Sequence, residues 1–395
     1  MPHLRKRYAT PLLNTKLGFS PVVSIQGARQ TGKSTLAREI LDKQQYITLD
    51  RPSIKDLAQE NPEIFLEEQR LQAQGKVLVI DEAQKAPRIF DQIKYLVDLN
   101  KKPGQFLLLG STEFSKELLI RESLLGRISR MRLYPMTLSE TLEHSFQSFP
   151  VNGQFASKNK ITRTAMVKFL NHGGYPGMFA IRNETERKQK IEDWLTLTCE
   201  RDALLFPKLK GDSDLCRKIL ALLAKVDEPN ISTVAHALKV NPRRVATQFE
   251  ILSQLFVIHR LNPHPLGTGK PHFFLNDPGI AHYLGASFER KLQTALLLEF
   301  LARRAYSTQK PQPLYYYRNT KGSLIHFVFE LESGSLSALK LISEESFDLR
   351  NFEILTAFAK KAKTAKFDTK LSASCANDGK IKERDIVFSS WEAFF

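Results

Sequence analysis

Cysteine is scarce in this chain, with three residues among 395, at Cys199, Cys216 and Cys375. They form no CxxC pair and no Cys/His set at metal-binding spacing. The pattern therefore indicates neither a disulfide framework nor a zinc site. We expect three reduced thiols.

Long apolar runs are also absent. No segment approaches the ~20 apolar residues that a membrane-spanning helix needs. The basic residues at 1–8 are not followed by the apolar core of a signal peptide. We expect a cytoplasmic protein with no membrane partner.

Acidic residues are in deficit, with 42 Asp and Glu against 58 Lys and Arg, which gives a formal net charge of +16. The excess is spread along the chain and forms no basic tail. A diffuse positive field suits DNA or another polyanion, but it is equally compatible with an ordinary basic protein.

Residues 20–142 alternate short apolar segments with amphipathic ones. This alternation predicts an α/β domain, a P-loop-type parallel sheet flanked by helices. The expected strands are Val22–Gln26, Tyr46–Leu49, Val77–Ile80, Phe106–Leu109 and Arg130–Leu133. The expected helices are Lys33–Asp42, Ile64–Ala73 and Phe90–Leu99.

A glycine-rich segment at 27–34 fits the pattern G-x4-G-K-[ST] between an apolar strand and a helix. Its glycines let backbone N–H groups face phosphate oxygens, and the helix N-terminus adds positive potential. Lys33 supplies a charge for the β- and γ-phosphates of ATP, and the Ser34 hydroxyl can ligate Mg²⁺. The predicted ATP-binding residues are Gly27, Ala28, Arg29, Gln30, Thr31, Gly32, Lys33, Ser34 and Thr35.

Two carboxylates follow the apolar run at 77–80. They stand at the carboxyl end of a predicted strand, the edge where open α/β sheets bind ligands. We expect Asp81 to hold Mg²⁺ together with Ser34. We expect Glu82 to orient the attacking water, which favours hydrolysis over transfer to a second substrate. A nucleotide kinase remains a minor alternative.

Two further residues are candidates for catalysis. Ser111 ends the strand expected between the two motif strands and would sense the γ-phosphate, with Thr112 as its rival. Arg127 precedes the last strand and would act as an arginine finger on a neighbouring subunit. Its rivals are Arg121, Arg130 and Arg132. An arginine finger in trans predicts a homo-oligomer.

These segments together resemble a large group of prokaryotic AAA-type (P-loop) ATP-binding proteins whose C-terminal half has no assigned function. The resemblance covers nearly the whole chain. The segments that carry it are Gly27–Ser34, Leu49-Asp50, Asp81–Gln84, Gly110-Ser111, Ser123–Arg127, Leu133–Glu140, Gly173–Pro176, Glu200–Asp202 and Phe273–Leu284.

The resemblance implies an AAA-like ATPase domain, a helical middle with a winged helix, and a small α/β C-terminal domain similar to PD-D/E-x-K (restriction-endonuclease-like) nucleases. We divide the chain accordingly into residues 1–145, a linker at 146–165, a helical region at 166–285 with the winged helix at about 214–262, and a C-terminal domain at 286–395.

The middle region contains a helix-turn-helix pattern. Ile231–Leu238 is expected to form a short helix capped by Ser232. Asn241 and Pro242 are expected to start the next helix. Arg243 and Arg244 would then stand at its N-terminus, where a recognition helix contacts DNA. The alternative is a fold that only couples the flanking domains.

The C-terminal domain departs from the nuclease pattern that the resemblance implies. Glu299 matches the first Glu of the pattern, but His326 stands at the Asp position. Lys340 and Ile342 replace the Glu and the Lys of the Glu-x-Lys strand. A single carboxylate does not hold a catalytic Mg²⁺ in the usual way. We expect a degenerate, inactive nuclease scaffold. Glu330 and Glu332 are taken as a solvent-facing strand edge.

The favoured hypothesis is a Mg²⁺-dependent ATPase whose hydrolysis drives a conformational or assembly switch, with an unknown protein partner. The first alternative is an ATP-gated DNA-binding protein that uses the winged helix. An active DNA nuclease is the least favoured.

Overall fold

The computed structural model describes residues 4–40, 46–113, 124, 126–147, 160–206, 209–308, 311–344, 349–376, 379–381 and 386–395. The chain forms two compact units. The N-terminal unit comprises residues 4–135 together with 254–257. The C-terminal unit comprises 136–253 and 258–395.

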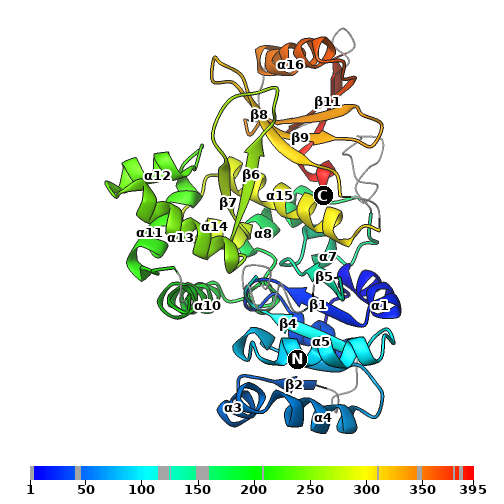
Figure 1. Cartoon of the computed structure of the whole chain (residues 1–395). Helices are drawn as coiled ribbons and strands as arrows, with labels where there is room; N and C mark the ends of the chain where they lie inside the picture. The colour runs from blue at the N-terminus through cyan, green and yellow to red at the C-terminus, as the bar shows by residue number, and fades with distance from the viewer. Residues whose placement is uncertain are drawn as a thin grey trace. The chain divides into compact units, whose positions relative to one another are not determined.

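The N-terminal unit is built on five parallel strands in the spatial order β2-β3-β4-β1-β5 (Figure 1). The strands are β1 (Val22–Gln26), β2 (Tyr46–Thr48), β3 (Leu78–Asp81), β4 (Phe106–Gly110) and β5 (Ile128–Arg132). The helices are α1 (Ala9–Phe19), α2 (Lys33–Ile40), α3 (Pro52–Glu60), α4 (Pro62–Ala73) and α5 (Ile89–Leu99).

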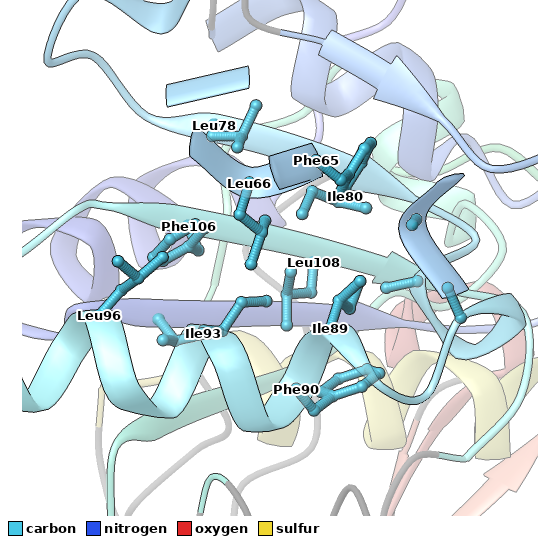
Figure 2. Packing of buried hydrophobic residues seen from close by; sticks show 14 of the residues in the cluster. Phe65, Leu66, Leu78, Ile80, Ile89, Phe90, Ile93, Leu96, Phe106 and Leu108 are labelled. Carbon is cyan, nitrogen blue, oxygen red and sulfur yellow. The ribbon is translucent and has the colours of Figure 1, made fainter. Parts of the chain in front are cut away.

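One face of this sheet packs against α3, α4 and α5. Side chains alternate along a strand, so Leu78 and Ile80 of β3 lie on the same face. They join Phe106 and Leu108 of β4 in one buried cluster, with Phe65 of α4 among the helical residues that cover them (Figure 2). This core fixes the carboxyl ends of β1, β3 and β4 next to one another.

The sequence predictions for this unit are confirmed in their main points. The sheet is parallel, and β4 lies between β1 and β3 as expected. Helices α1 and α3 were not predicted. The helix expected to reach Asp42 is described to Ile40, and residues 41 and 42 lie outside the described part.

The C-terminal unit combines a helical layer with an eight-stranded sheet (Figure 1). Its α-helices are α7 (Leu138–Thr141), α8 (Arg163–His172), α9 (Pro176–Phe179), α10 (Glu184–Thr196), α11 (Ser213–Lys225), α12 (Ile231–Leu238), α13 (Pro242–Gln254), α14 (Pro278–Tyr283), α15 (Phe288–Tyr306) and α16 (Glu353–Thr364). Its strands are β6 (Ile258–Pro263), β7 (His272–Leu275), β8 (Leu314–Arg318), β9 (Leu324–Glu330), β10 (Leu336–Leu341), β11 (Thr369–Cys375), β12 (Gly379–Ile381) and β13 (Ile386–Ser390).

The strand order is β12-β13-β11-β10-β9-β8-β6-β7. The hairpin β6–β7 therefore belongs to the same sheet as the C-terminal strands, because Asn262 of β6 pairs in parallel with Tyr315 of β8. The boundary expected between 285 and 286 falls inside one compact unit, and the boundary expected at 145 falls ten residues beyond Pro135, where the N-terminal unit ends.

The helix caps differ in one place from the prediction. Asn230, not Ser232, caps α12, since its Oδ1 accepts the N–H groups of Ser232 at 3.0 Å and Thr233 at 3.1 Å. Asn241 precedes α13 as expected, and its Oδ1 accepts the N–H of Arg243 at 2.8 Å.

All three cysteines are buried and free. Burial raises the pKa of each thiol to about 12, so they stay protonated at neutral pH. Within the described part of the chain, no helix is both long and apolar enough to span a bilayer.

Candidate functional site

The phosphate loop connects β1 to α2 and is tightly wound. The Gly27 N–H donates to the Gly110 carbonyl at 3.2 Å, which ties the loop to the end of β4. A Cβ on Gly27 would stand 2.2 Å from the Leu133 carbonyl oxygen. Gln30 and Gly32 both have positive φ, at 66° and 97°. Glycine at position 27 is thus required by close approach of the backbone, as the motif predicts.

Lys33 lies inside this loop. Its Nζ donates to the carbonyls of Gly27 at 2.8 Å and Ala28 at 2.9 Å, and the residue is 6% exposed. The Thr31 hydroxyl also donates to the Ala28 carbonyl, at 2.9 Å. The ammonium charge is therefore held at the place where the loop would receive phosphate oxygens.

Arg7 stabilises the phosphate loop through hydrogen bonds to backbone carbonyls. Its guanidinium donates to the carbonyls of Thr31 at 2.8 Å and Tyr134 at 2.7 Å, and it is buried. The sequence does not mark Arg7 as a site residue, because it stands before α1, far from the motif, and carries no local signal.

The carboxylate of Asp81 meets Ser34 across the site. The Ser34 hydroxyl donates to Asp81 Oδ2 at 2.9 Å, and the Glu82 N–H donates to Oδ1 at 3.0 Å. Tyr46 also donates its hydroxyl to Oδ2. The two predicted Mg²⁺ ligands are thus brought together. A hydroxyl and a carboxylate are oxygen ligands of the kind that Mg²⁺ takes, so the residues present fit that ion.

Glu82 and Ser111 form the second pair of the site. Glu82 Oε2 accepts the Ser111 hydroxyl at 2.8 Å and the Gln84 amide at 2.5 Å. Both Glu82 and Ser111 are nearly buried. Glu82 has φ of 56°, an unusual conformation for a residue other than glycine. Sequence analysis placed Gln84 in a family segment only, and gave it no role.

Asp50 lies just after β2, the strand next to β3. It forms an ion pair with Lys85, which directly follows Gln84. Burial acts to raise the pKa of Asp50, but the hydrogen bond and charge of Lys85, aided by Arg29, outweigh it and lower that pKa. Asp50 therefore stays ionised beside the site.

Arg127 lies away from these residues. It immediately precedes β5, whose first residue Ile128 pairs with Val22, the first residue of β1. The phosphate loop follows the opposite, carboxyl end of β1. Arg127 forms a two-pronged ion pair with Asp98, with Nε–Oδ1 at 2.5 Å and Nη2–Oδ2 at 2.9 Å. It therefore lies at the opposite edge of the sheet from the phosphate loop of its own chain.

The rivals of Arg127 have other surroundings. Arg132 places its guanidinium over the rings of Tyr134 and Phe256, at 4.8 and 4.6 Å from their centroids. Arg130 is exposed on β5. Arg121, like Ser123 and Leu125 of the family segment, lies outside the described residues.

The residues of the expected nuclease pattern have different partners. Glu299 is fully buried on α15, and Arg303 on the same helix donates to it at 2.9 Å. His326 instead meets Glu289, ten residues earlier on α15, with Nε2 3.3 Å from Oε1. The Leu341 N–H donates to His326 Nδ1 at 3.0 Å, so the imidazole proton lies on Nε2.

The Glu289 carboxylate accepts two further hydrogen bonds. Gln293 donates to Oε1 at 3.0 Å and Ser343 donates to Oε2 at 2.9 Å. The charge of Lys340 acts on Glu289 as well, and burial lowers the pKa of that lysine. Among the described residues, no group of three or more His, Cys, Asp or Glu side chains could hold a metal ion.

The two arginines of the expected recognition helix differ in their contacts. Arg243 and Arg244 are both exposed at the start of α13. Arg244 forms an ion pair with Asp212, with Nη2–Oδ2 at 2.8 Å. The helices α11, α12 and α13 are followed directly by the antiparallel pair β6 and β7.

Comparison with known proteins gives two family matches. Residues 20–142 match the family model described as AAA domain, and residues 163–292 match one described as a domain of unknown function (DUF8612). The N-terminal unit thus carries an AAA-type P-loop domain.

Two curated relatives are similar over most of the chain. They are the uncharacterized proteins Rv2008c of Mycobacterium tuberculosis and Mb2031c of Mycobacterium bovis. Each is 25% identical over 341 residues, which covers 83% of this chain and 72% of the relative.

Among solved structures, the chain is similar to the Walker-type ATPase PABY2304 of Pyrococcus abyssi. The TM-score is 0.44 at 16% identity, and the match covers 71% of this chain and 96% of that one. It is also similar to PH0952 of Pyrococcus horikoshii, a signal-transduction ATPase with numerous domains, with a TM-score of 0.30 at 14% identity, over 77% and 47% of the two chains.

Proposed function

Starting from an AAA-type P-loop domain in the N-terminal unit, we propose that the protein is a Mg²⁺-dependent ATPase whose hydrolysis drives a conformational or assembly switch. The observation that carries the proposal is the contact of 2.9 Å between Ser34 and Asp81, beside a loop that holds Lys33 in its interior. A metal–phosphate complex needs these three groups on one side of the sheet.

Lys33 and the loop N–H groups bind the phosphates in this proposal. Lys33 Nζ exchanges the carbonyls of Gly27 and Ala28 for β- and γ-phosphate oxygens when ATP enters. Arg7 holds the Thr31 carbonyl outward, so that the loop keeps its curvature.

Ser34 and Asp81 hold the metal. When bound, Mg²⁺ neutralises the charge that develops on the β- and γ-phosphate oxygens. The Ser34 oxygen would serve as a ligand, while Asp81 would keep the hydrogen bond from the Ser34 hydroxyl or orient a water of the ion.

Glu82 orients the attacking water, and Ser111 senses the γ-phosphate. Both groups are engaged with each other and with Gln84. Both donors reach the same oxygen, Oε2, and a carboxylate can also accept a hydrogen bond from the water at its other oxygen. Gln84 and Ser111 thereby set the orientation in which the Glu82 carboxylate would meet the water.

The test is the rate of phosphate release from ATP. We expect Lys33→Ala to lose ATP binding and Glu82→Gln to keep ATP binding but to lower turnover by about 100-fold or more, in the range of a positioned general base. Glu68→Gln, an exposed residue of α4, is the matched control and keeps the wild-type rate. Wild-type turnover that persists in Glu82→Gln would refute the assigned role of Glu82.

Arg127 acts in trans in this proposal, within a homo-oligomer. It would have to leave Asp98 to reach the nucleotide of a neighbour. Turnover per subunit should then rise with protein concentration in the wild type. It should stay low and independent of concentration in Arg127→Ala, while the exposed-lysine control Lys101→Ala behaves as wild type. A wild-type turnover per subunit that does not change with protein concentration would contradict the role of Arg127 in trans.

A second candidate function is ATP-gated DNA binding by a winged helix. It is favoured by the order of three helices and a hairpin, and by the exposed arginines at the start of α13. We expect Arg243→Ala to weaken binding of a DNA duplex and to reduce its salt dependence by about one phosphate contact. Arg182→Ala, an exposed arginine outside this segment, is the control. Equal affinity of both variants would exclude α13 as the DNA contact.

We also propose that the degenerate nuclease-like segment 286–395 has no metal-dependent nuclease activity. The ion pair of Glu299 with Arg303 and the neighbourhood of Lys340 support this proposal. Mg²⁺-dependent cleavage of DNA by the wild type, abolished in Glu299→Ala, would contradict it.

A further inference from the structure

Asp81 accepts a hydrogen bond from one hydroxyl that does not belong to the phosphate-binding motifs. Its Oδ2 accepts both the Ser34 hydroxyl and the Tyr46 hydroxyl, while its Oδ1 accepts the Glu82 N–H. Ser34 and Asp81 belong to recognised sequence patterns. Tyr46 comes from β2 and belongs to none of the patterns described above.

Tyr46 reaches Asp81 because of strand register. β2 pairs in parallel with β3, with Tyr46 opposite Val79 and Thr48 opposite Asp81. Residues 79 and 81 point to the same face of β3. The side chain of Tyr46 therefore extends along that face to the carboxylate two residues further on.

The ring of Tyr46 is fixed by Arg38. The Arg38 guanidinium lies over the ring, 4.4 Å from its centroid. Both residues line a groove of about 430 Å³ along β2, together with Ile47, Thr48, Arg51 and Ile54. The contact with Arg38 restrains the ring in addition to the hydrogen bond that its hydroxyl donates to Asp81.

We infer that Tyr46 is a positioning residue of the Mg²⁺ site, which holds the Asp81 carboxylate in the orientation that the metal complex needs, with Arg38 holding Tyr46 in turn. This inference rests on the proposed ATPase function. Two hydroxyl donors on one oxygen and a backbone donor on the other leave Asp81 a single orientation. With the Tyr46 hydroxyl removed, Oδ2 keeps one donor, and Asp81 can rotate about its side-chain bonds.

The consequence is specific to the metal. The Tyr46 hydroxyl meets the side chains of Asp81 and Ser34, the two predicted Mg²⁺ ligands, so ATP binding without Mg²⁺ should not depend on it. The Mg²⁺ concentration that the protein needs should depend on the Tyr46 hydroxyl. Loss of a hydrogen bond to a charged group commonly changes an equilibrium by about tenfold or more.

The experiment measures binding of a fluorescent ATP analogue and phosphate release over a Mg²⁺ titration, with an EDTA arm. Tyr46→Phe removes only the hydroxyl and keeps the ring under Arg38. Its half-saturating Mg²⁺ concentration should rise about tenfold, while its affinity for the analogue in EDTA stays at the wild-type value. Arg38→Gln should shift the Mg²⁺ requirement in the same direction by a smaller factor.

Tyr95→Phe is the matched control, since Tyr95 is 55% exposed on α5. It should leave the Mg²⁺ requirement unchanged. A merely structural role of Tyr46 would lower thermal stability without moving the Mg²⁺ half-saturation. An unchanged Mg²⁺ requirement in Tyr46→Phe would overturn this inference and leave the proposed ATPase function untouched. A wild-type protein that binds no ATP analogue would overturn the proposed function and the inference together.

Discussion

At the scale of single residues, the phosphate loop depends on the close approach of two backbone segments at Gly27. We predict that Gly27→Ala lowers the free energy of unfolding of the N-terminal unit by about 3 kcal/mol, because the new Cβ would meet the Leu133 carbonyl at 2.2 Å. The measurement is denaturant unfolding. Gly18→Ala is the control, since nothing lies within 4 Å of a Cβ there, and it should be neutral or slightly stabilising. Equal stability of the two variants would contradict the account of the loop.

Glu299 provides a second prediction at this scale. Glu299→Gln should destabilise the C-terminal unit by about 3 kcal/mol, because it leaves the buried Arg303 without its ionic partner. Thermal unfolding of this variant is compared with Glu332→Gln, which changes an exposed glutamate on the same unit. A variant as stable as the control would show that the buried pair is not structural.

The sequence predicted residues of the site where they are contiguous. The loop at 27–34 and the pair Asp81-Glu82 could be identified because each occupies a short, fixed spacing. Arg7, Tyr46 and Gln84 could not, because their contacts depend on tertiary packing or strand register. The partner of His326 could not be predicted for a related reason. Its helix carries two glutamates three turns apart, and only packing reveals that Glu289 meets His326.

At the scale of elements, the cap of α12 can be tested directly. Asn230→Ala should cost about 1 kcal/mol, because its side chain accepts two N–H groups of the first turn. Ser232→Ala, at the position where the sequence suggested the cap, should cost only a few tenths as an exposed site. Chemical denaturation of both variants gives the comparison. A larger loss of unfolding free energy in Ser232→Ala than in Asn230→Ala would show that Ser232 is the N-cap.

Strands were easier to predict than helices in the N-terminal unit. The central strands β1, β3 and β4 are largely apolar runs that a parallel sheet buries, so their composition marks them, whereas β2 is half-buried and β5 carries two arginines. α3 is a short, largely polar helix whose apolar stripe is limited to Ile54, Leu57 and Ala58, of which Ala58 is fully buried. The hairpin β6–β7 shows a different limit. Its local sequence indicates strands, but its pairing with β8 joins residues more than fifty positions apart.

At the scale of the whole molecule, the two units differ in their response to acid. None of the nine histidines falls within residues 4–135 or 254–257. In the C-terminal unit, burial lowers the pKa values of four histidines to about 4, namely His172, His264, His272 and His326. The stability that they contribute is present above the unfolded pKa of about 6.5 and is lost as pH falls toward 4.

We therefore predict that acidification from pH 7.5 to 5 destabilises the C-terminal unit selectively, by about 1 kcal/mol for each buried histidine. Asp277 opposes this trend, because burial raises its pKa to about 6 and its folded form takes up a proton first. One such group offsets only part of the effect of four. Calorimetry against pH should show one transition that moves and one that stays, and His326→Gln should reduce the slope by about one proton. Two transitions that shift together would contradict the prediction.

The whole account depends on the N-terminal unit as a site for Mg²⁺ and ATP. The most direct measurement is the binding isotherm of ATP with Mg²⁺, for the wild type and for Lys33→Ala, with Lys94→Ala as a control lysine on α5. We predict saturable binding by the wild type and the control, and an affinity at least about 100-fold lower in Lys33→Ala. Equal affinity in all three proteins, or no binding by the wild type, would contradict the account.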